Sequence, residues 1–154
     1  MSNDDVATVE RVIPAPPERI FALLADASRH KDFDGSGTVK GTDHAEPLRL
    51  GSRFGMSMRI VAPYSMVSTV VEYEENRRIA WQPKPAYPLI NRIIGGRIWR
   101  YELEPVDGGT LVRESWDITH EPLKFAVRPQ RGVTIRNMTA TLERLEELLA
   151  ASPA

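Results

Sequence analysis

The sequence predicts an α+β fold in which one antiparallel β-sheet packs against a long C-terminal helix. Three observations indicate this fold class. Residues 98–119 form two alternating runs joined by Asp107-Gly108, a two-residue turn typical of a β-hairpin. Residues 52–83 contain further runs with the period-two alternation of strands. Residues 134–150 carry apolar side chains at helical spacing, which predicts a helix that covers the apolar face of the sheet.

Composition limits the classes of protein to consider. The chain has 154 residues, no cysteine and a formal net charge of −1. Its length indicates a single domain, residues 1–154. The missing cysteines exclude disulfides, thiol nucleophiles and thiolate metal sites, and the net charge gives no general reason to expect nucleic acid or an anionic membrane as a partner. No run approaches the roughly 20 apolar residues of a membrane span, and the polar start lacks a signal peptide, so we expect a cytoplasmic protein without stable membrane insertion.

The first elements are a strand and two short helices. Val6–Ile13 is rich in β-formers and stops at Pro14. Residues 15–26 are predicted to form a helix, because two prolines suit its first turn and an apolar stripe follows. Residues 28–34 are predicted to add a short helical turn, and the glycines that follow break the chain.

A meander of strands comes next. Residues 52–60 alternate cleanly and place Phe54, Met56 and Met58 on one face. Residues 64–75 continue as a strand. The expected inward-facing residues of that strand are Val67, Thr69, Val71 and Tyr73.

The following strand, residues 77–83, should return antiparallel to it. A three-residue loop would pair Glu74 with Arg78 and Tyr73 with Ile79, and it would place Val71 opposite Trp81.

The Asp107-Gly108 turn also fixes the register of the next hairpin. It pairs Leu103 with Val112, Tyr101 with Glu114, and Trp99 with Trp116, whereas Glu102 meets Arg113 on the other face. Glu114 therefore points toward the apolar side of the sheet. A carboxylate there is costly unless it has a partner, water or a chemical role.

Two connections have open interpretations. Residues 84–96 form a long loop with an apolar middle, which is a lid, a homodimer contact or an exposed loop. Four cations gather around the start of the last helix: Lys124, Arg128, Arg131 and Arg136. With the helix N-terminus they would hold an anionic head group, or they form a solvated positive end.

The chain resembles the SRPBCC superfamily, the START-like or Bet v 1-like helix-grip proteins, and within it the bacterial polyketide cyclase/dehydrase and lipid-transport branch. The resemblance rests on VERVIPAPPERIFALLADASRHKDF, RRIAW, WRYELEPVDGGTLVRESWDI and TATLERLEELL, in this order. It implies a helix-grip fold: a curved seven-stranded antiparallel sheet wrapped around the C-terminal helix, two short helices after the first strand, and a hydrophobic ligand cavity. Members include carriers, receptors, cyclases, hydrolases and co-chaperone-like proteins, so the resemblance implies less about chemistry.

The predicted ligand-binding residues combine the inward-facing positions of the sheet with two positions of the last helix. They are Phe54, Met56, Met58, Thr69, Tyr73, Trp81, Trp99, Tyr101, Glu114, Trp116, Met138 and Leu142. Glu114 has three interpretations: it forms a buried pair with a cation such as Arg136, it binds a ligand hydroxyl or amine, or it acts as a general acid or base with Tyr101. Burial should raise its pKa in each unpaired case.

These residues, together with the resemblance, favour binding of a hydrophobic or aromatic small molecule, lipid or polyketide-like, in a cavity between the sheet and the C-terminal helix. One alternative is a polyketide cyclase or dehydratase that uses Glu114 as acid and base, and whether the protein is an enzyme stays open at this point. Another is a co-chaperone-like or dimerising interaction module. No cofactor or metal is expected, because His30, His44 and His120 are far apart and show no metal-binding spacing. His30 and His120 are predicted to be solvated loop residues, with the cavity rim as the alternative position.

Overall fold

The computed structural model describes residues 5–35, 39–42, 46–59, 63–85 and 95–151, with the backbone alone for residues 39–42, 56–59, 63–65 and 85. The strands are β1 (Val6–Ile13), β2 (Val39–Thr42), β3 (Arg53–Arg59), β4 (Pro63–Glu74), β5 (Arg78–Pro85), β6 (Ile98–Val106) and β7 (Gly109–Asp117). The helices are α1 (Pro17–Leu24), α2 (His30–Phe33), α3 (Lys124–Val127) and α4 (Arg131–Ala151), with 3₁₀ turns at Ala27–Arg29 and Arg128–Gln130.

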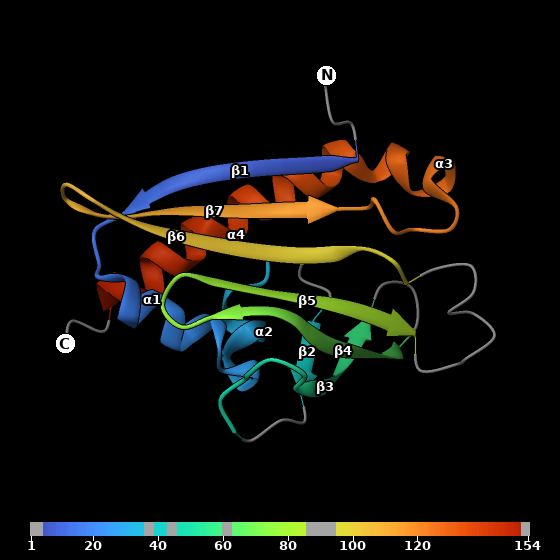
Figure 1. Cartoon of the computed structure of the whole chain (residues 1–154), viewed down its shortest axis with the longest axis horizontal. Helices are drawn as coiled ribbons and strands as arrows, with labels where there is room; N and C mark the ends of the chain where they lie inside the picture. Colours follow the sequence, from blue (N-terminus) through green and yellow to red (C-terminus); the bar gives the residue numbers. More distant parts are fainter. Residues whose placement is uncertain (1–4, 36–38, 43–45, 60–62, 86–94, 152–154) are drawn as a thin grey trace.

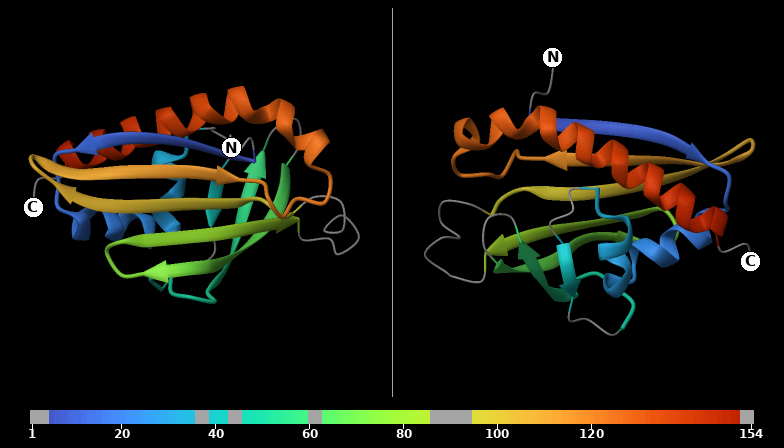
Figure 2. Two further views of the ribbon diagram at one scale, coloured as in Figure 1. Left: turned by 45° about the horizontal axis from the view of Figure 1, so that its top comes forward. Right: turned by 180° about the vertical axis from the view of Figure 1, so that it is seen from behind.

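All described strands join one antiparallel sheet in the order β1-β7-β6-β5-β4-β3-β2. Six strands have seven to twelve residues, and the edge strand β2 has only four. The sheet curves around α4, which crosses its inner face from one end to the other (Figures 1 and 2). The predicted helix-grip fold is thereby confirmed. None of the described helices is long and apolar enough to cross a bilayer.

The register of the β6–β7 hairpin is as predicted. Tyr101 pairs with Glu114, Trp99 with Trp116 and Glu102 with Arg113. Gly108 has φ +87°, a backbone conformation that favours glycine and that the tight turn requires. The turn therefore sets which side chains of both strands face α4.

The predicted register of β4 is correct only near its turn. Glu74 pairs with Arg78 and Tyr73 with Ile79, but a β-bulge then shifts the ladder, and Trp81 pairs with Val70 instead of Val71. Val70 is 1% exposed and Val71 is 37% exposed. The prediction that Val67, Thr69 and Val71 face inward is wrong, because the extra residue of a bulge moves every residue beyond it to the other face.

The core between sheet and α4 consists of two clusters. The larger one includes Trp81, Tyr101 and Leu142 and extends under α1 and α2. The smaller one contains Ala7, Trp116, Ile118, Val127 and Met138 near the start of α4. Both clusters use α4 as their second wall, so this helix holds the two ends of the molecule together.

Candidate functional site

Two rows of side chains cross the inner face of the sheet. The first row runs through Val9, Glu114, Tyr101, Ile79 and Tyr73, which are successive cross-strand neighbours on β1, β7, β6, β5 and β4. The second row runs through Ala7, Trp116, Trp99, Trp81 and Val70 on the same strands. All three tryptophans of the chain therefore stand side by side in one row, next to the row that holds the carboxyl group.

Glu114 is buried, and one of its two carboxyl oxygens accepts a hydrogen bond. Its side chain comes from the middle of β7, and the residue is 3% exposed. The Tyr101 hydroxyl donates a hydrogen bond of 2.9 Å to Oε2, as the predicted register suggested. Oε1 has no hydrogen-bond partner within the part of the chain that the structure describes. The alternative that Arg136 pairs with Glu114 is wrong, because Arg136 is exposed.

Burial controls the protonation of this pair. Loss of water raises the pKa of Glu114 well above its usual value, the hydrogen bond from Tyr101 lowers it, and the negative charge of Asp34 raises it further. Burial and the Glu114 carboxyl group likewise raise the pKa of Tyr101 well above 10.0. Both shifts favour the protonated, uncharged form of each group, in which each carries a hydrogen that it can donate.

The pair lies where the two core clusters meet. Tyr101 belongs to the larger cluster, whereas Trp116, the next inward-facing residue of β7 after Glu114, belongs to the smaller one. Val9 and Trp99 pack against both clusters, yet both are only half-buried. Apolar side chains beside Glu114 are thus partly accessible, on the face of the sheet that packs against α1, α2 and α4.

Most of the described residues in the predicted set lie on this inner face or on α4. Phe54, Tyr73, Trp81, Trp99, Tyr101, Trp116 and Leu142 belong to or pack against the clusters, and so does Met138. Thr69 lies on the opposite face, because the β4 bulge places its neighbours Ser68 and Val70 inside. The side chains of Met56 and Met58, and residues 86–94 of the predicted loop, lie outside the described residues.

His30 is part of the core, so the prediction of a solvated loop residue is wrong. Its ring stacks on Trp81 with centroids 4.6 Å apart and meets Phe33 and Phe54 edge-on. Nε2 donates to the carbonyl of Leu24 at 2.9 Å. Burial lowers the pKa of His30 to about 4, and the ring is therefore neutral at physiological pH.

His44 lies outside the described residues. His120 is exposed just after β7, as expected for a loop histidine. No three His, Asp or Glu side chains of the described part gather in a way that could hold a metal ion.

Two further buried polar residues were missed by sequence reasoning. Ser68 is fully buried on the inner face of β4, and its Oγ has no partner among the described residues. Glu121 is buried after β7 and accepts hydrogen bonds from the backbone of Gly95 and Arg97, the latter at 2.5 Å. Glu121 thus anchors the chain just before β6. Ser68 faces the core because of the β4 bulge, and the bulge has no clear signal in the sequence.

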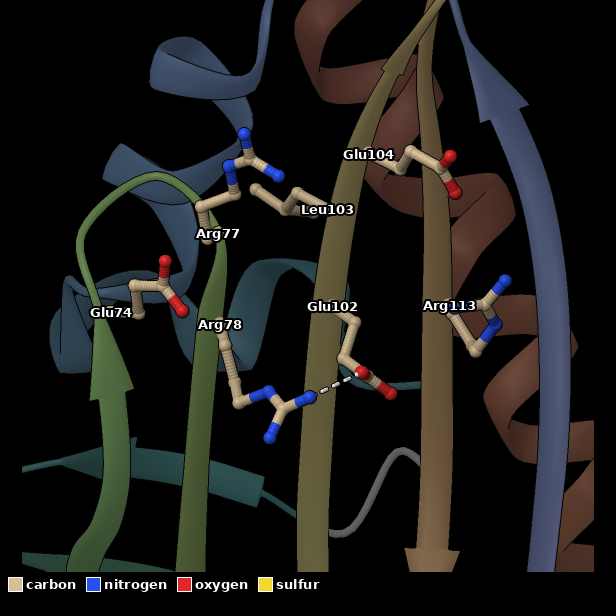
Figure 3. Close-up of a pocket in the computed structure, with 7 residues that line it drawn as sticks. All are labelled: Glu74, Arg77, Arg78, Glu102, Leu103, Glu104 and Arg113. Carbon is tan, nitrogen blue, oxygen red and sulfur yellow. Dashed lines mark hydrogen bonds and ion pairs between the residues drawn. The ribbon is translucent and has the colours of Figure 1, made fainter.

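The outer face of the sheet is charged and has a different character. Arg100 bridges Glu72 at 2.6 Å and Asp117 at 3.4 Å. A depression of about 250 Å³ lies near the β4–β5 and β6–β7 turns (Figure 3). It is lined by Glu74, Arg77, Arg78, Glu102, Leu103, Glu104 and Arg113. Because almost all of these side chains are charged, this depression does not suit the predicted apolar ligand.

Comparison with known proteins agrees with the helix-grip fold. The family described as polyketide cyclase/dehydrase and lipid transport matches residues 5–150. An uncharacterised protein of Mycobacterium tuberculosis is 34% identical over 108 residues, which cover 68% of this chain and 44% of that protein. The chain therefore spans less than half the length of this relative.

Solved structures share the fold at low sequence identity. A Nitrosomonas europaea protein matches with a TM-score of 0.72 and 19% identity, over 98% of this chain and 97% of that one. A polyketide-cyclase-like protein of Corynebacterium glutamicum matches with a TM-score of 0.63 and 20% identity, over 97% and 94% of the two chains. At such identities the likeness shows the fold alone.

Proposed function

Because the chain belongs to the polyketide cyclase/dehydrase and lipid transport family, we propose that it binds a hydrophobic or aromatic small molecule between the sheet and α4. A fold shared by carriers and enzymes does not fix function, so the site must carry the proposal. The observation that carries it is the buried Glu114 Oε1, which has no partner among the described residues. Such an atom costs free energy unless a polar group reaches it, and a ligand would supply that group.

The directions of the hydrogen bonds indicate which ligand group fits. Tyr101 has a single hydroxyl hydrogen and donates it to Oε2 of Glu114. The raised pKa favours the protonated form of Glu114, in which its own hydrogen is available on Oε1. The pair therefore offers a donor, and the matching ligand group is an acceptor such as a carbonyl oxygen. An amine cation is disfavoured, because it would need the ionised form of the carboxyl group.

The surroundings of the pair suit the rest of such a ligand. The tryptophan row runs beside the pair, and Trp99 has accessible surface although it faces α4. Aromatic side chains and a few oriented polar groups are the usual lining of small-molecule sites. The half-buried Val9 and Trp99 support the proposal that the ligand lies against these two residues.

The same pair supports a catalytic alternative. A protonated carboxyl group beside a tyrosine hydroxyl would polarise a ketone and transfer a proton to its oxygen, as a cyclisation or dehydration requires. The raised pKa of Glu114 favours the role of general acid at neutral pH. Binding and catalysis then differ in one point only, which is whether the proton leaves Oε1.

Variants of Glu114 separate the two functions. Glu114→Gln keeps a donor, because its amide N–H₂ replaces the protonated Oε1, but the amide cannot transfer a proton. Glu114→Leu removes the donor. We expect acetylnaphthalene to quench tryptophan fluorescence at about tenfold lower concentration than ethylnaphthalene, which lacks the carbonyl oxygen. This preference should persist in Glu114→Gln and vanish in Glu114→Leu.

The exposed Glu104→Leu change on the same hairpin is the control and should leave the preference intact. Mass spectrometry of compounds released from the denatured protein would give the natural ligand class. Equal affinities for ketone and hydrocarbon in the unaltered protein would contradict the donor site. Turnover of a released ketone that Glu114→Gln abolishes while binding persists would establish the catalytic alternative.

A further inference from the structure

We propose that the end of the molecule formed by residues 121–136 docks on the surface of an anionic lipid bilayer. This surface lies at the N-terminal end of α4, on the outside of the molecule (Figures 1 and 2). The inference goes beyond the proposed ligand site and does not depend on it. It rests on exposed apolar side chains and on a local excess of positive charge in one short segment.

Phe125 is the centre of this docking surface. It is 73% exposed, the highest value among the described large hydrophobic side chains, and Leu123 and Val133 are exposed beside it in sequence. The burial of Val127 explains why Phe125 is exposed. Val127 is buried in the small core cluster, and successive helical residues turn by about 100°, so Phe125, two residues earlier, points to the opposite side of α3. The phenyl ring is thus held outward by the packing of its own helix.

The exposed stripe continues without charge into α4. Residues 124–151 are helical throughout, apart from the 3₁₀ turn Arg128–Gln130. Phe125, Pro129 and Val133 form this uncharged stripe: they lie on α3, in the 3₁₀ turn and in the first turn of α4, and all three are exposed. Ala126, Gln130 and Gly132 are also exposed and uncharged. This composition is unusual for a solvated helix surface, where charged residues predominate, and it suits the boundary between head groups and acyl chains.

Cations alternate in sequence with the residues of the stripe. Lys124, Arg128, Arg131 and Arg136 lie in residues 121–136, and the one acidic residue there, Glu121, has a fully buried side chain.

Asp5 is a half-buried acidic neighbour from the start of the chain: it pairs with Lys124 at 3.7 Å and with Arg128 at 3.0 Å. Counted with Asp5 and Glu121, residues 121–136 carry four cations against two carboxylates, a local excess of two positive charges. The near-neutral net charge of the whole chain conceals this local excess.

Charge complementarity favours a lipid surface over a second copy of the chain. Two copies that met through this patch would bring eight cations together around two phenyl rings, which like-charge repulsion opposes. Anionic head groups neutralise the cations while the exposed ring enters the interface, and each Lys or Arg near such a surface contributes about fivefold to binding. The long side chains of Arg128 and Arg136 can extend to the head groups while the stripe stays apolar.

Flotation with vesicles tests the proposal. We expect the intact protein to bind phosphatidylcholine vesicles that contain about one-third phosphatidylglycerol, and not vesicles of phosphatidylcholine alone. Phe125→Ser should weaken binding about tenfold, and Arg136→Gln about fivefold. Leu50→Ser and Arg77→Gln are matched controls, because Leu50 is 66% exposed and Arg77 is an exposed arginine, both far from α3 in sequence. Neither control should change binding.

Three results would overturn the proposal. The first is no binding to either vesicle, and the second is an equal loss in the Phe125 and Leu50 variants. The third is self-association in the absence of lipid that Phe125→Ser abolishes in sedimentation velocity, because a second copy would then cover the patch. Circular dichroism of each variant confirms that the fold is intact, which an exposed substitution should not disturb.

Discussion

Moving the Glu114 side chain out of water has a free-energy cost that the hydrogen bond from Tyr101 offsets only in part. The carboxyl group avoids most of this cost by staying protonated, which is why burial raises its pKa. The residue is nevertheless a poor choice for stability alone, since a leucine or valine would fill the same row of the sheet without a polar atom. A buried group of this kind is a candidate for function, because such sites are where proteins tolerate unfavourable residues.

Glu114→Gln should make the protein more stable at neutral pH. Below the unfolded pKa of 4.5 the carboxyl group is protonated in both states. As the pH rises above that value, the unfolded state ionises while the folded state stays protonated, so the wild-type free energy of unfolding falls. Glutamine does not titrate, and the advantage of the variant should grow by up to about 1.4 kcal/mol per pH unit.

Urea denaturation of both proteins at several pH values measures this difference. The exposed Glu104→Gln change on the neighbouring strand is the control and should show no growing advantage. A difference that stays constant with pH would mean that Glu114 ionises in the folded protein.

At the scale of elements, the bulge in β4 decides which side chains reach the core. Val70 and Val71 are adjacent valines, one buried and one exposed, because the ladder shifts between Val70 and Glu72. Val70→Thr puts a hydroxyl group into the core and should cost about 2 kcal/mol of unfolding free energy. Val71→Thr keeps the shape and β-propensity of the side chain in solvent and should cost less than about 0.5 kcal/mol.

Chemical denaturation of the two variants measures both costs, and each variant controls for the other. Equal costs would place the two valines in equivalent surroundings and contradict the bulge.

The elements differ in how well the sequence predicts them, for identifiable reasons. The β6–β7 register is predicted correctly because its two-residue turn leaves a single pairing that keeps charges and rings on separate faces. The predicted register of β4 is correct from Glu72 to Glu74 and wrong for the residues before Glu72. The bulge inserts one residue there, and nothing in the alternation of the sequence marks it. The sequence predicts no strand at Val39–Thr42, because four residues are too few for a periodic pattern.

The candidate site could be predicted only where the register was right. The Tyr101–Glu114 pair follows directly from the hairpin, whereas the position of Ser68 depends on the bulge. The burial of His30 depends on how a short helix folds back onto Trp81, a tertiary contact that no local pattern indicates.

At the scale of the whole molecule, titrating groups on different elements make opposite contributions to the pH dependence of stability. His30 contributes its full stabilisation above its unfolded pKa of 6.5 and loses it as the pH falls toward its folded pKa of about 4, whereas Glu114 favours stability at low pH. Glu72 and Asp117 have lowered pKa values; a hydrogen bond from Arg100 lowers that of Glu72, and hydrogen bonds from Thr119 outweigh burial at Asp117. Their stabilisation is therefore lost in acid. Stability should consequently pass through a maximum, with His30, Glu72 and Asp117 limiting it on the acid side.

The contribution of His30 to acid unfolding can be isolated with a matched pair of histidines. The pKa of His30 falls from 6.5 in the unfolded chain to about 4 in the fold, so the unfolded state binds more protons between these values. Stability should therefore decrease as the pH falls through this window, by up to about 3 kcal/mol in total. His30→Gln removes the titrating group and should flatten this part of the profile, although the lost ring stacking lowers stability at every pH.

His120→Gln changes an exposed histidine and is the control. In urea denaturation it should retain the full decrease of stability with falling pH. Identical slopes in the two variants would show that His30 gains its proton without unfolding.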